Sequence, residues 1–225
     1  YSSAASDVYK RQGIPIAKIA ALIMSGVKLA SFGLRETAPK HVAVKEAVFP
    51  FARFPGVDSI LGPEMKSTGE VMGIDVNFAS AFAKSQIAAG TFLPESGAVF
   101  ISVRDDHKES ILELANTLCQ HGFSLLATSG TAEILRKSGL PAKTIKKVLE
   151  GRPHVVDNMI SGHIDLVINT TGGTQAIQDS FSLRRTALTH SIPYYTTVEG
   201  AKAAVQAITA IKNGPLEVAT LQSYL

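Results

Sequence analysis

Apolar residues recur at two different spacings along this chain, and the change of spacing divides it into two parts. In residues 14–29 they recur at three- and four-residue steps, which predicts a helix with one apolar face. Residues 40–75 are interrupted every few positions by Pro or Gly, so we expect this segment to lie on a larger body. A second helix is predicted over residues 78–89, and the polar stretch after Gly90 is a natural boundary.

Beyond this boundary, short apolar runs alternate with amphipathic segments. The runs AVFISV, FSLLAT, DLVINT and IPYYTT, which begin at residues 98, 123, 165 and 192, are expected to form strands. Helices are predicted over residues 106–122, 131–139, 155–161, 175–189 and 201–211. Strands that alternate with helices indicate an α/β fold with a parallel sheet flanked by helices. We therefore expect one Rossmann-like domain over residues 91–225.

Composition limits the classes of partner. The chain has 225 residues, and its 22 basic and 19 acidic residues are interspersed to give a net charge of +3, so no nucleic-acid partner is expected. No apolar run reaches the roughly 20 residues that span a bilayer, and no secretion signal is visible. We therefore expect no membrane partner and a cytoplasmic location. Small anions remain plausible ligands.

Two local features are expected to carry no chemistry. Cys119 is the only cysteine and falls on a mostly apolar helix face, which is typical of an inert buried thiol. Residues 1–12 are rich in Ser and Ala and have no periodicity. We interpret them as a non-native leader and expect the natural protein to continue upstream.

Candidate ligand-binding residues follow the predicted strands, because ligands of open parallel sheets bind at the carboxyl ends of strands. Arg104 and Lys108 follow the first run, and a Thr-Ser-Gly-Thr loop begins at Thr128 after the second. After the third run comes a loop of Thr and Gly that begins at Asn169. Hydroxyls and backbone N–H groups at helix starts bind anions, and Lys147 could add a charge. This pattern predicts a phosphate site.

Each of these loops also has a purely structural explanation. Taken singly, each is better explained as an N-cap and a tight turn, and only the combination of two loops with nearby lysines favours a site. His154 and Asp157 could form an acid–base pair, but a His at a helix start is more often a cap. No nucleotide-binding, hydrolase or metal-binding motif is present. We therefore predict no catalytic residue and no metal ligand.

Three segments resemble one enzyme family. Residues 54–73, which include GPEMKSTGE, and residues 150–159 and 168–188 are similar to the C-terminal portion of the carbamoyl phosphate synthetase large subunit. The resemblance covers essentially everything after Gln12. It implies that residues 13–90 are the tail of an ATP-grasp domain with a linker, and that residues 91–225 are a methylglyoxal-synthase-like allosteric domain.

The resemblance also implies what the complete enzyme does. Family members are glutamine-hydrolysing, ATP-dependent ligases that make carbamoyl phosphate for pyrimidine and arginine synthesis. Their ATP, Mg²⁺ or Mn²⁺, and K⁺ are expected to bind upstream, so this fragment should be non-catalytic and hold no cofactor. The expected partners are a small glutaminase subunit and other large subunits.

Two regulatory sites follow from the resemblance. A uridylate- or inosinate-type nucleotide monophosphate would bind at Lys108, Thr128, Thr131, Lys147, Asn169 and Thr171. Ornithine would bind at Glu46, Tyr194 and Thr196. The chain reads TTGGTQ from Thr170 to Gln175, where bacterial relatives read TTSGRR. The loss of two positive charges puts the affinity for nucleotide, and the choice of nucleotide, in doubt.

Other functions stay open at the level of the sequence. A stand-alone phosphate-binding lyase of the methylglyoxal synthase type needs a carboxylate base near its substrate, and the loop from Gly172 to Gln175 contains no acid. A domain that binds no ligand and only forms an oligomer surface is the third alternative. In the allosteric interpretation, an effector acts by binding one arrangement of the domains better than another, a difference of about 1 to 3 kcal/mol.

Overall fold

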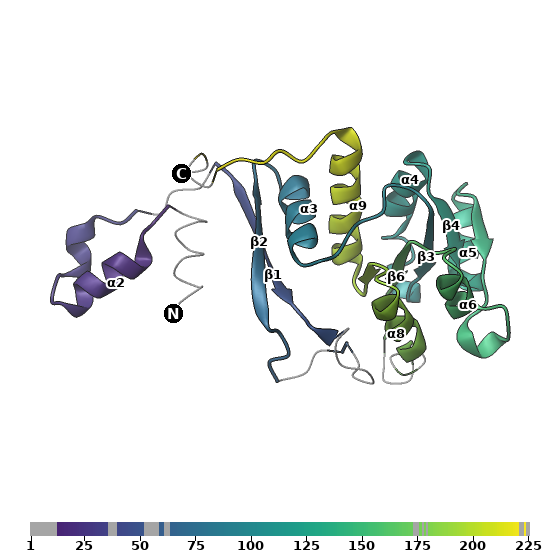
Figure 1. Ribbon diagram of the computed structural model, residues 1–225. Helices are drawn as coiled ribbons and strands as arrows, with labels where there is room; N and C mark the ends of the chain where they lie inside the picture. Colours follow the sequence, from purple (N-terminus) through teal and green to yellow (C-terminus); the bar gives the residue numbers. More distant parts are fainter. Residues whose placement is uncertain are drawn as a thin grey trace.

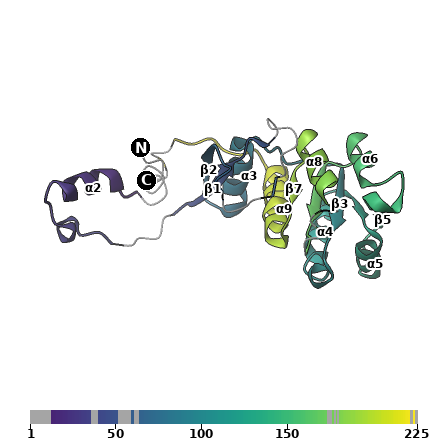
Figure 2. The same ribbon diagram turned by 90° about the horizontal axis from the view of Figure 1, so that it is seen from below.

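The computed structural model arranges the elements of the chain in an extended row (Figure 1). Helix α2 (Ile16–Met24) lies at one end, followed by a small sheet with helix α3 and then by a larger sheet with its own helices. Seen from below, α2 is again set apart from the other elements (Figure 2). The structure describes residues 13–35, 40–51, 59–60, 64–172, 176, 178, 180–220 and 223. The expected leader lies outside these residues, and so do Gly173, Thr174 and Gln175 of the Thr- and Gly-rich loop.

The segment rich in Pro and Gly contains a two-stranded antiparallel sheet, which the sequence pattern did not predict. Its strands are β1 (Val42–Val48) and β2 (Gly69–Asp75). Pro50 lies after the end of β1, so it does not interrupt the ladder. Helix α3 (Phe78–Ala88) packs on both strands.

Gly73 permits a close approach between α3 and β2. A Cβ atom at this position would meet the backbone oxygen of Ala81 and the backbone nitrogen of Ser85. Only glycine avoids that collision. The close packing fixes the carboxyl-terminal half of α3, where the polar side chains of Ser85 and Gln86 are buried.

The larger body is a five-stranded sheet in the order β5-β4-β3-β6-β7, with every neighbouring pair parallel. This confirms the predicted α/β class. Each of the four predicted runs contains a strand, whereas the short edge strand β5 was not predicted. The strands are β3 (Ala98–Ser102), β4 (Ser124–Ala127), β5 (Ala142–Thr144), β6 (Leu166–Asn169) and β7 (Tyr194–Tyr195).

The helices that follow the strands match the predicted ones, with shifted ends. The first begins later than expected, because residues 105–107 form a 3₁₀ turn. The last begins earlier, because Thr197 caps it by accepting a hydrogen bond from Gly200 N. The helices are α4 (Leu112–Gln120), α5 (Ser129–Lys137), α6 (Val155–Ile160), α8 (Phe181–Thr189) and α9 (Val198–Asn213).

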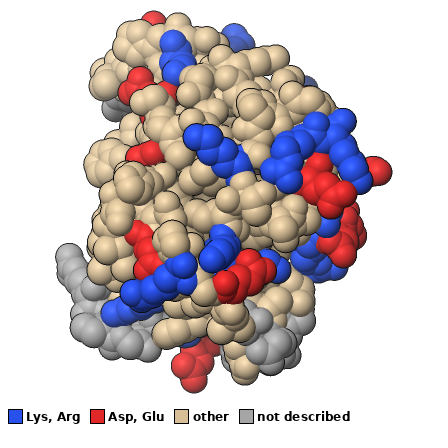
Figure 3. Space-filling view, turned by 90° about the vertical axis from the view of Figure 1, so that its right-hand side faces the viewer, with Lys and Arg blue, Asp and Glu red and all other residues tan. Residues whose placement is uncertain are grey.

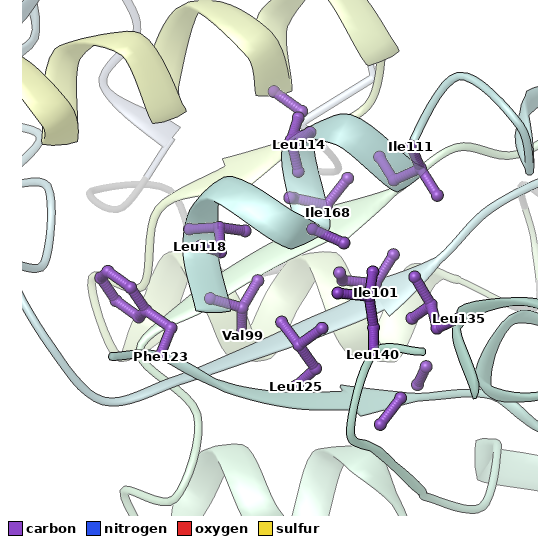
Figure 4. Close-up of a cluster of buried hydrophobic side chains, with 14 of the residues drawn as sticks. Val99, Ile101, Ile111, Leu114, Leu118, Phe123, Leu125, Leu135, Leu140 and Ile168 are labelled. Carbon is purple, nitrogen blue, oxygen red and sulfur yellow. The ribbon is translucent and has the colours of Figure 1, made fainter. Parts of the chain in front are cut away.

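The side chains of each strand alternate between two buried clusters, as the pleat of a strand requires. Val99 and Ile101 belong to a cluster that includes residues of α4, α5 and α9. Figure 4 shows this cluster, with side chains of α4 such as Leu118 above the strands. Phe100, between them in sequence, belongs to the opposite cluster with residues of α6 and α8. The sheet is therefore covered on both faces.

Helix α9 joins the two bodies. It packs on the sheet through buried residues such as Ile208 and also contacts α3. In Figure 1, α3 and α9 lie side by side between the small sheet and the large one. No helix in the described part of the chain is both long and apolar enough to span a membrane.

Candidate functional site

The order of the strands creates a crevice at the carboxyl edge of the large sheet. From β3 the chain proceeds outward to β4 and β5, and it then crosses to β6 and β7 on the other side of β3. The helix after β3 covers one face, and the helix after β6 covers the opposite face. Ligands of open α/β sheets bind at such a switch point, because the two connections diverge there.

A cavity of about 500 Å³ lies at this point, and we call it the switch-point cavity. Its polar residues come from the carboxyl ends of the strands, and its apolar wall comes from both the sheet and the helices. The lining residues are Phe100, Ser102, Val103, Arg104, Asp105, Thr128, Lys147, Val148, Leu149, Glu150, Val155, Asn169, Thr170, Thr171, Gly172, Ala176, Ser180 and Leu183. Four of the six predicted effector residues are among them, and Lys108 and Thr131 are not.

Hydroxyl groups gather where β4 meets α5. Thr128 donates toward Ser102 Oγ at 3.5 Å and toward Thr131 Oγ1 at 3.4 Å. Thr131 also accepts a hydrogen bond of 3.4 Å from Val103 N. These contacts are long, and Thr128 is the N-cap of α5 without a side-chain capping bond. The hydroxyl at the cavity wall can therefore turn toward a ligand beside the positive end of α5.

Lys108 reaches this same helix end. Its Nζ lies 2.7 Å from Asp105 Oδ1 and 3.1 Å from the Cβ position that Gly130 leaves empty. The hydrogen bond and the charge of Lys108, with a further contribution from Lys147, lower the pKa of the exposed Asp105 carboxyl. Asp105 is therefore ionised at neutral pH, and it pairs with Lys108, whose charge an anionic ligand would need.

Thr170, which follows β6, contacts two residues of the loop that follows β3. Its Oγ1 accepts from Arg104 N at 3.1 Å and lies 3.0 Å from His107 Nδ1. Arg104 in turn forms a bidentate pair with Asp106 through Nε at 3.0 Å and Nη2 at 2.6 Å. Gly172 lies against the Arg104 side chain, because a Cβ there would approach the guanidinium to about 3.0 Å.

Asn169, at the end of β6, points toward the edge of the sheet. Its Nδ2 donates to Ser180 Oγ at 3.1 Å and to Tyr194 OH at 2.7 Å. Both N–H groups of the amide are therefore engaged. This bond connects a residue of the switch-point cavity to a residue predicted for the ornithine site.

A second cavity, of about 380 Å³, lies between the two bodies, and we call it the junction cavity. Glu46 of β1 and Tyr194 of β7 both line it. Thr196 follows β7 with an exposed side chain and is not one of the lining residues. The structure thus brings two of the three predicted ornithine residues together. The lining residues are Glu46, Phe49, Gln86, Ala89, Gly90, Thr91, Ala187, Leu188, Ser191, Ile192, Pro193, Tyr194 and Tyr195.

Hydrogen bonds surround the Glu46 carboxylate in the junction cavity. Its Oε2 accepts from Gln86 Nε2 at 2.6 Å and from Ser85 Oγ at 3.1 Å. Tyr195 OH donates to Gln86 Oε1 at 2.7 Å. Burial raises the pKa of the Tyr195 phenol, and the nearby Glu46 charge raises it further. The phenol therefore keeps its proton at neutral pH and remains a donor.

His154 and Asp157 form a capping box at the start of α6, and His154 Nδ1 also lies 3.1 Å from Asp157 Oδ2. His154 is the N-cap of α6, where its Nδ1 accepts from Asp157 N at 3.3 Å, and Asp157 Oδ2 accepts from His154 N at 2.9 Å. Among the described residues, no group of three or more His, Cys, Asp or Glu side chains is arranged to hold a metal ion.

The surface charge around the large sheet is mixed. On the face drawn in Figure 3, the Lys and Arg side chains of the described residues form separate groups with Asp and Glu beside them. This face carries no continuous basic stripe of the kind that follows a phosphate backbone.

Several cavity residues could not be chosen from the sequence. Asp105 and Ser180 line the switch-point cavity, and Gln86 and Tyr195 line the junction cavity. Asp105 is next to Arg104 in the sequence, which is only weak evidence that it lines the cavity. Gln86 lies 109 residues from its partner Tyr195 in the sequence, and no local sequence pattern predicts a contact over that separation.

A scan against family models finds a match within the large sheet and its helices. Residues 110–196 match the family described as the MGS-like domain. The matched residues begin near α4 and end at β7, so they include the loops from β4, β5 and β6 that line the switch-point cavity.

The chain is also similar to curated proteins along almost its whole length. The carbamoyl phosphate synthase large chain of Myxococcus xanthus (strain DK1622) is 58% identical over 219 residues, which are 97% of this chain and 20% of that protein. That of Rhizobium meliloti (strain 1021) is 56% identical over 223 residues, 96% of this chain and 19% of that protein. The recognition based on the motifs is confirmed. The chain spans about a fifth of the length of these relatives.

Among solved structures, the methylglyoxal synthase of Elizabethkingia anophelis NUHP1 resembles part of the chain. The TM-score is 0.43 with 17% sequence identity, and the match covers 50% of this chain and 79% of that one.

Proposed function

We propose that this chain is a regulatory part of a glutamine-dependent carbamoyl phosphate synthase large chain. In this proposal a nucleoside monophosphate binds the switch-point cavity, and an ornithine-like diamino acid binds the junction cavity. The observation that carries the proposal is the switch-point cavity itself. Its volume of about 500 Å³ lies within the range of roughly 300 to 1,000 Å³ typical of small-ligand sites.

The lining of the switch-point cavity suits the two halves of a nucleotide. Thr128 is the N-cap of α5, where the helix dipole favours a phosphate, and Lys147 adds a positive charge to the lining of the same cavity. Phe100, Val155 and Leu183 offer an apolar wall for a base.

The junction cavity suits a cationic ligand. Glu46 supplies a carboxylate, and the Tyr194 phenol supplies a polar group on the opposite side. A primary ammonium group donates three hydrogen bonds and would pair with the carboxylate. Because the cavity lies between the small sheet and the large one, the affinity for its ligand can depend on how the two bodies are arranged.

The catalytic activity is assigned to the complete protein. We propose that ATP, Mg²⁺ or Mn²⁺, K⁺ and the glutaminase partner act outside the residues of this chain, and that the chain changes the rate of carbamoyl phosphate synthesis through its ligands. This assignment is supported by the names of relatives of which the chain spans only a fifth.

A lyase of the methylglyoxal synthase type remains the competing function, because Asp105 and Glu150 place carboxylates in the switch-point cavity. Neither has the environment of a general base. Asp105 is paired with Lys108 and its pKa is lowered, which makes it a weak proton acceptor. Glu150 accepts from Lys147 N at 2.8 Å as part of a turn.

Thermal unfolding of the chain with uridine monophosphate, inosine monophosphate or inorganic phosphate tests the proposal. A ligand present at a hundred times its dissociation constant should stabilise the fold by about 2.7 kcal/mol. We expect stabilisation by at least one nucleotide beyond that given by phosphate at the same concentration. Stabilisation by phosphate alone, together with formation of methylglyoxal from dihydroxyacetone phosphate, would favour the lyase. No stabilisation by any of the three would favour the ligand-free alternative.

A further inference from the structure

The two residues of β7 extend in opposite directions from the edge of the sheet. Successive side chains of a strand point to opposite faces, and Tyr194 and Tyr195 follow that rule. Tyr194 packs with the cluster under α6 and α8, and Tyr195 packs with the cluster under α4, α5 and α9. Each hydroxyl ends in a short hydrogen bond of 2.7 Å, the first to Asn169 and the second to Gln86.

The hydrogen bonds on the Tyr195 side have one consistent polarity. An ionised carboxylate only accepts, so Gln86 must turn its Nε2 toward Glu46 and its Oε1 toward Tyr195. The oxygen of Gln86 then requires a donor, which the protonated Tyr195 phenol provides. The three side chains come from β7, α3 and β1, and they therefore cross from the large sheet to the small one.

We propose that Tyr195, acting through Gln86, is a positioning residue for the Glu46 carboxylate, and that its short hydrogen bond sets the affinity of the junction cavity for an amine. This inference rests on the proposed function, since it assumes that Glu46 binds an ammonium group. Gln86 is 6% exposed, so the amide has few other partners that could hold its orientation if the phenol were removed. With the phenol absent, Gln86 Oε1 loses its donor, and the amide is held only by packing and by its hydrogen bond to Glu46.

The pair also makes the amine site responsive to the large sheet. Tyr194 and Tyr195 are adjacent on a two-residue strand, so a shift of β7 moves both hydroxyls at once. Tyr194 bonds to Asn169 of the switch-point cavity. Occupancy of that cavity can therefore affect Glu46 through the short strand β7 and three side chains, those of Tyr194, Tyr195 and Gln86. Packed and hydrogen-bonded groups of this kind couple sites.

The test is calorimetric titration of the chain with L-ornithine, before and after Tyr195→Phe, Gln86→Met and the double substitution. Tyr195→Phe removes one oxygen and keeps the ring. We expect Tyr195→Phe to raise the dissociation constant about five- to tenfold, the usual effect of one hydrogen bond between neutral groups. Gln86→Met should raise it at least as much, because it also removes the hydrogen bond to Glu46. In the Gln86→Met background Tyr195→Phe should have no further effect, because the phenol acts only through the amide.

The control is Thr189→Val on α8, whose hydroxyl bonds to Arg185 O and lines neither cavity. It should leave ornithine affinity unchanged. Titration of each variant with uridine monophosphate shows that the fold is intact and tests the nucleotide site separately. Ornithine affinity that is equal in the unaltered chain and in Tyr195→Phe would overturn the inference and leave the proposed function standing. Additive effects of the two substitutions would also overturn it, and absence of ornithine binding by the unaltered chain would overturn both the inference and the proposed amine site.

Discussion

Asn169 Nδ2 donates a hydrogen bond of 2.7 Å to the hydroxyl of Tyr194. Asn169 lines the switch-point cavity, and Tyr194 lines the junction cavity. The two cavities are therefore separated by one side-chain contact at the edge of the sheet. A ligand that draws the Asn169 amide toward itself must change this contact.

Tyr194→Phe should weaken the fold and the nucleotide site together. The substitution leaves a buried amide N–H of Asn169 without its acceptor, which costs about 1 kcal/mol of unfolding free energy. Because Asn169 then loses a fixed orientation, we expect uridine monophosphate to bind about threefold more weakly. Urea denaturation and calorimetry measure the two effects. Unchanged values for both would show that the bond orients nothing.

Asp105→Asn should strengthen nucleotide binding. Asp105 Oδ1 lies 2.7 Å from Lys108 Nζ. Asp105 also lines the cavity that the phosphate would enter, where its negative charge would repel the ligand. Neutralising it frees Lys108 and removes a repulsion, so we expect affinity for uridine monophosphate to rise about three- to tenfold at low salt and less at high salt. The control is Glu113→Gln, which makes the same charge change at an exposed position of α4. Weaker binding in Asp105→Asn would mean that the carboxylate helps to bind the ligand.

Tyr195 should make the fold sensitive to alkaline pH. Burial and Glu46 raise the pKa of the phenol in the folded chain, whereas in the unfolded chain it stays near 10. Above about pH 10 the unfolded state releases a proton that the folded state retains, so the free energy of unfolding falls as pH rises. Below that pH the contribution is fully present. The free energy of unfolding, measured by denaturation from pH 8 to 11, should fall less steeply in Tyr195→Phe than in the unaltered chain. An identical fall in both proteins would contradict the raised pKa of Tyr195.

Gly73→Ala should disturb the small sheet and its helix. The added methyl group would meet the backbone of Ala81 and Ser85, and overpacking of this kind costs about 1 to 3 kcal/mol. Because α3 carries Ser85 and Gln86 toward Glu46, ornithine binding should weaken as well. Gly69→Ala on the same strand is the matched control, since nothing lies within 4 Å of its Cβ position. Equal stability of the two variants in urea would show that α3 can move away at little cost.

The large sheet could be predicted from the sequence because each of its main strands is a short apolar run followed by an amphipathic segment. Val99, Phe100 and Ile101 are all buried, and this continuous burial is typical of a parallel strand covered on both faces. The loops that follow the strands could also be predicted, since topology alone brings the carboxyl ends of parallel strands to one edge.

The small sheet and the junction could not be predicted in this way. In β1 no position is buried, and intermediate and exposed positions alternate over only part of the strand. The strand pairs with β2 only across a connection whose sequence is rich in Pro and Gly. The polar network there joins residues that are far apart in sequence: Glu46 and Gln86 are 40 positions apart, and Gln86 and Tyr195 are 109 apart. Such contacts depend on how α3 and α9 pack, and no local period encodes that packing.

Calorimetric titration of the chain with uridine monophosphate, compared between the unaltered protein, Lys147→Ala and Lys143→Ala, tests the central claim most directly. Lys147 lines the switch-point cavity, whereas Lys143 is exposed on β5 and does not line it. We expect saturable binding that Lys147→Ala weakens about tenfold, the loss of one charge-assisted contact to phosphate, and that Lys143→Ala leaves within twofold of the unaltered protein. No binding by the unaltered chain, or equal weakening by both substitutions, would contradict a nucleotide site at the switch point of the sheet.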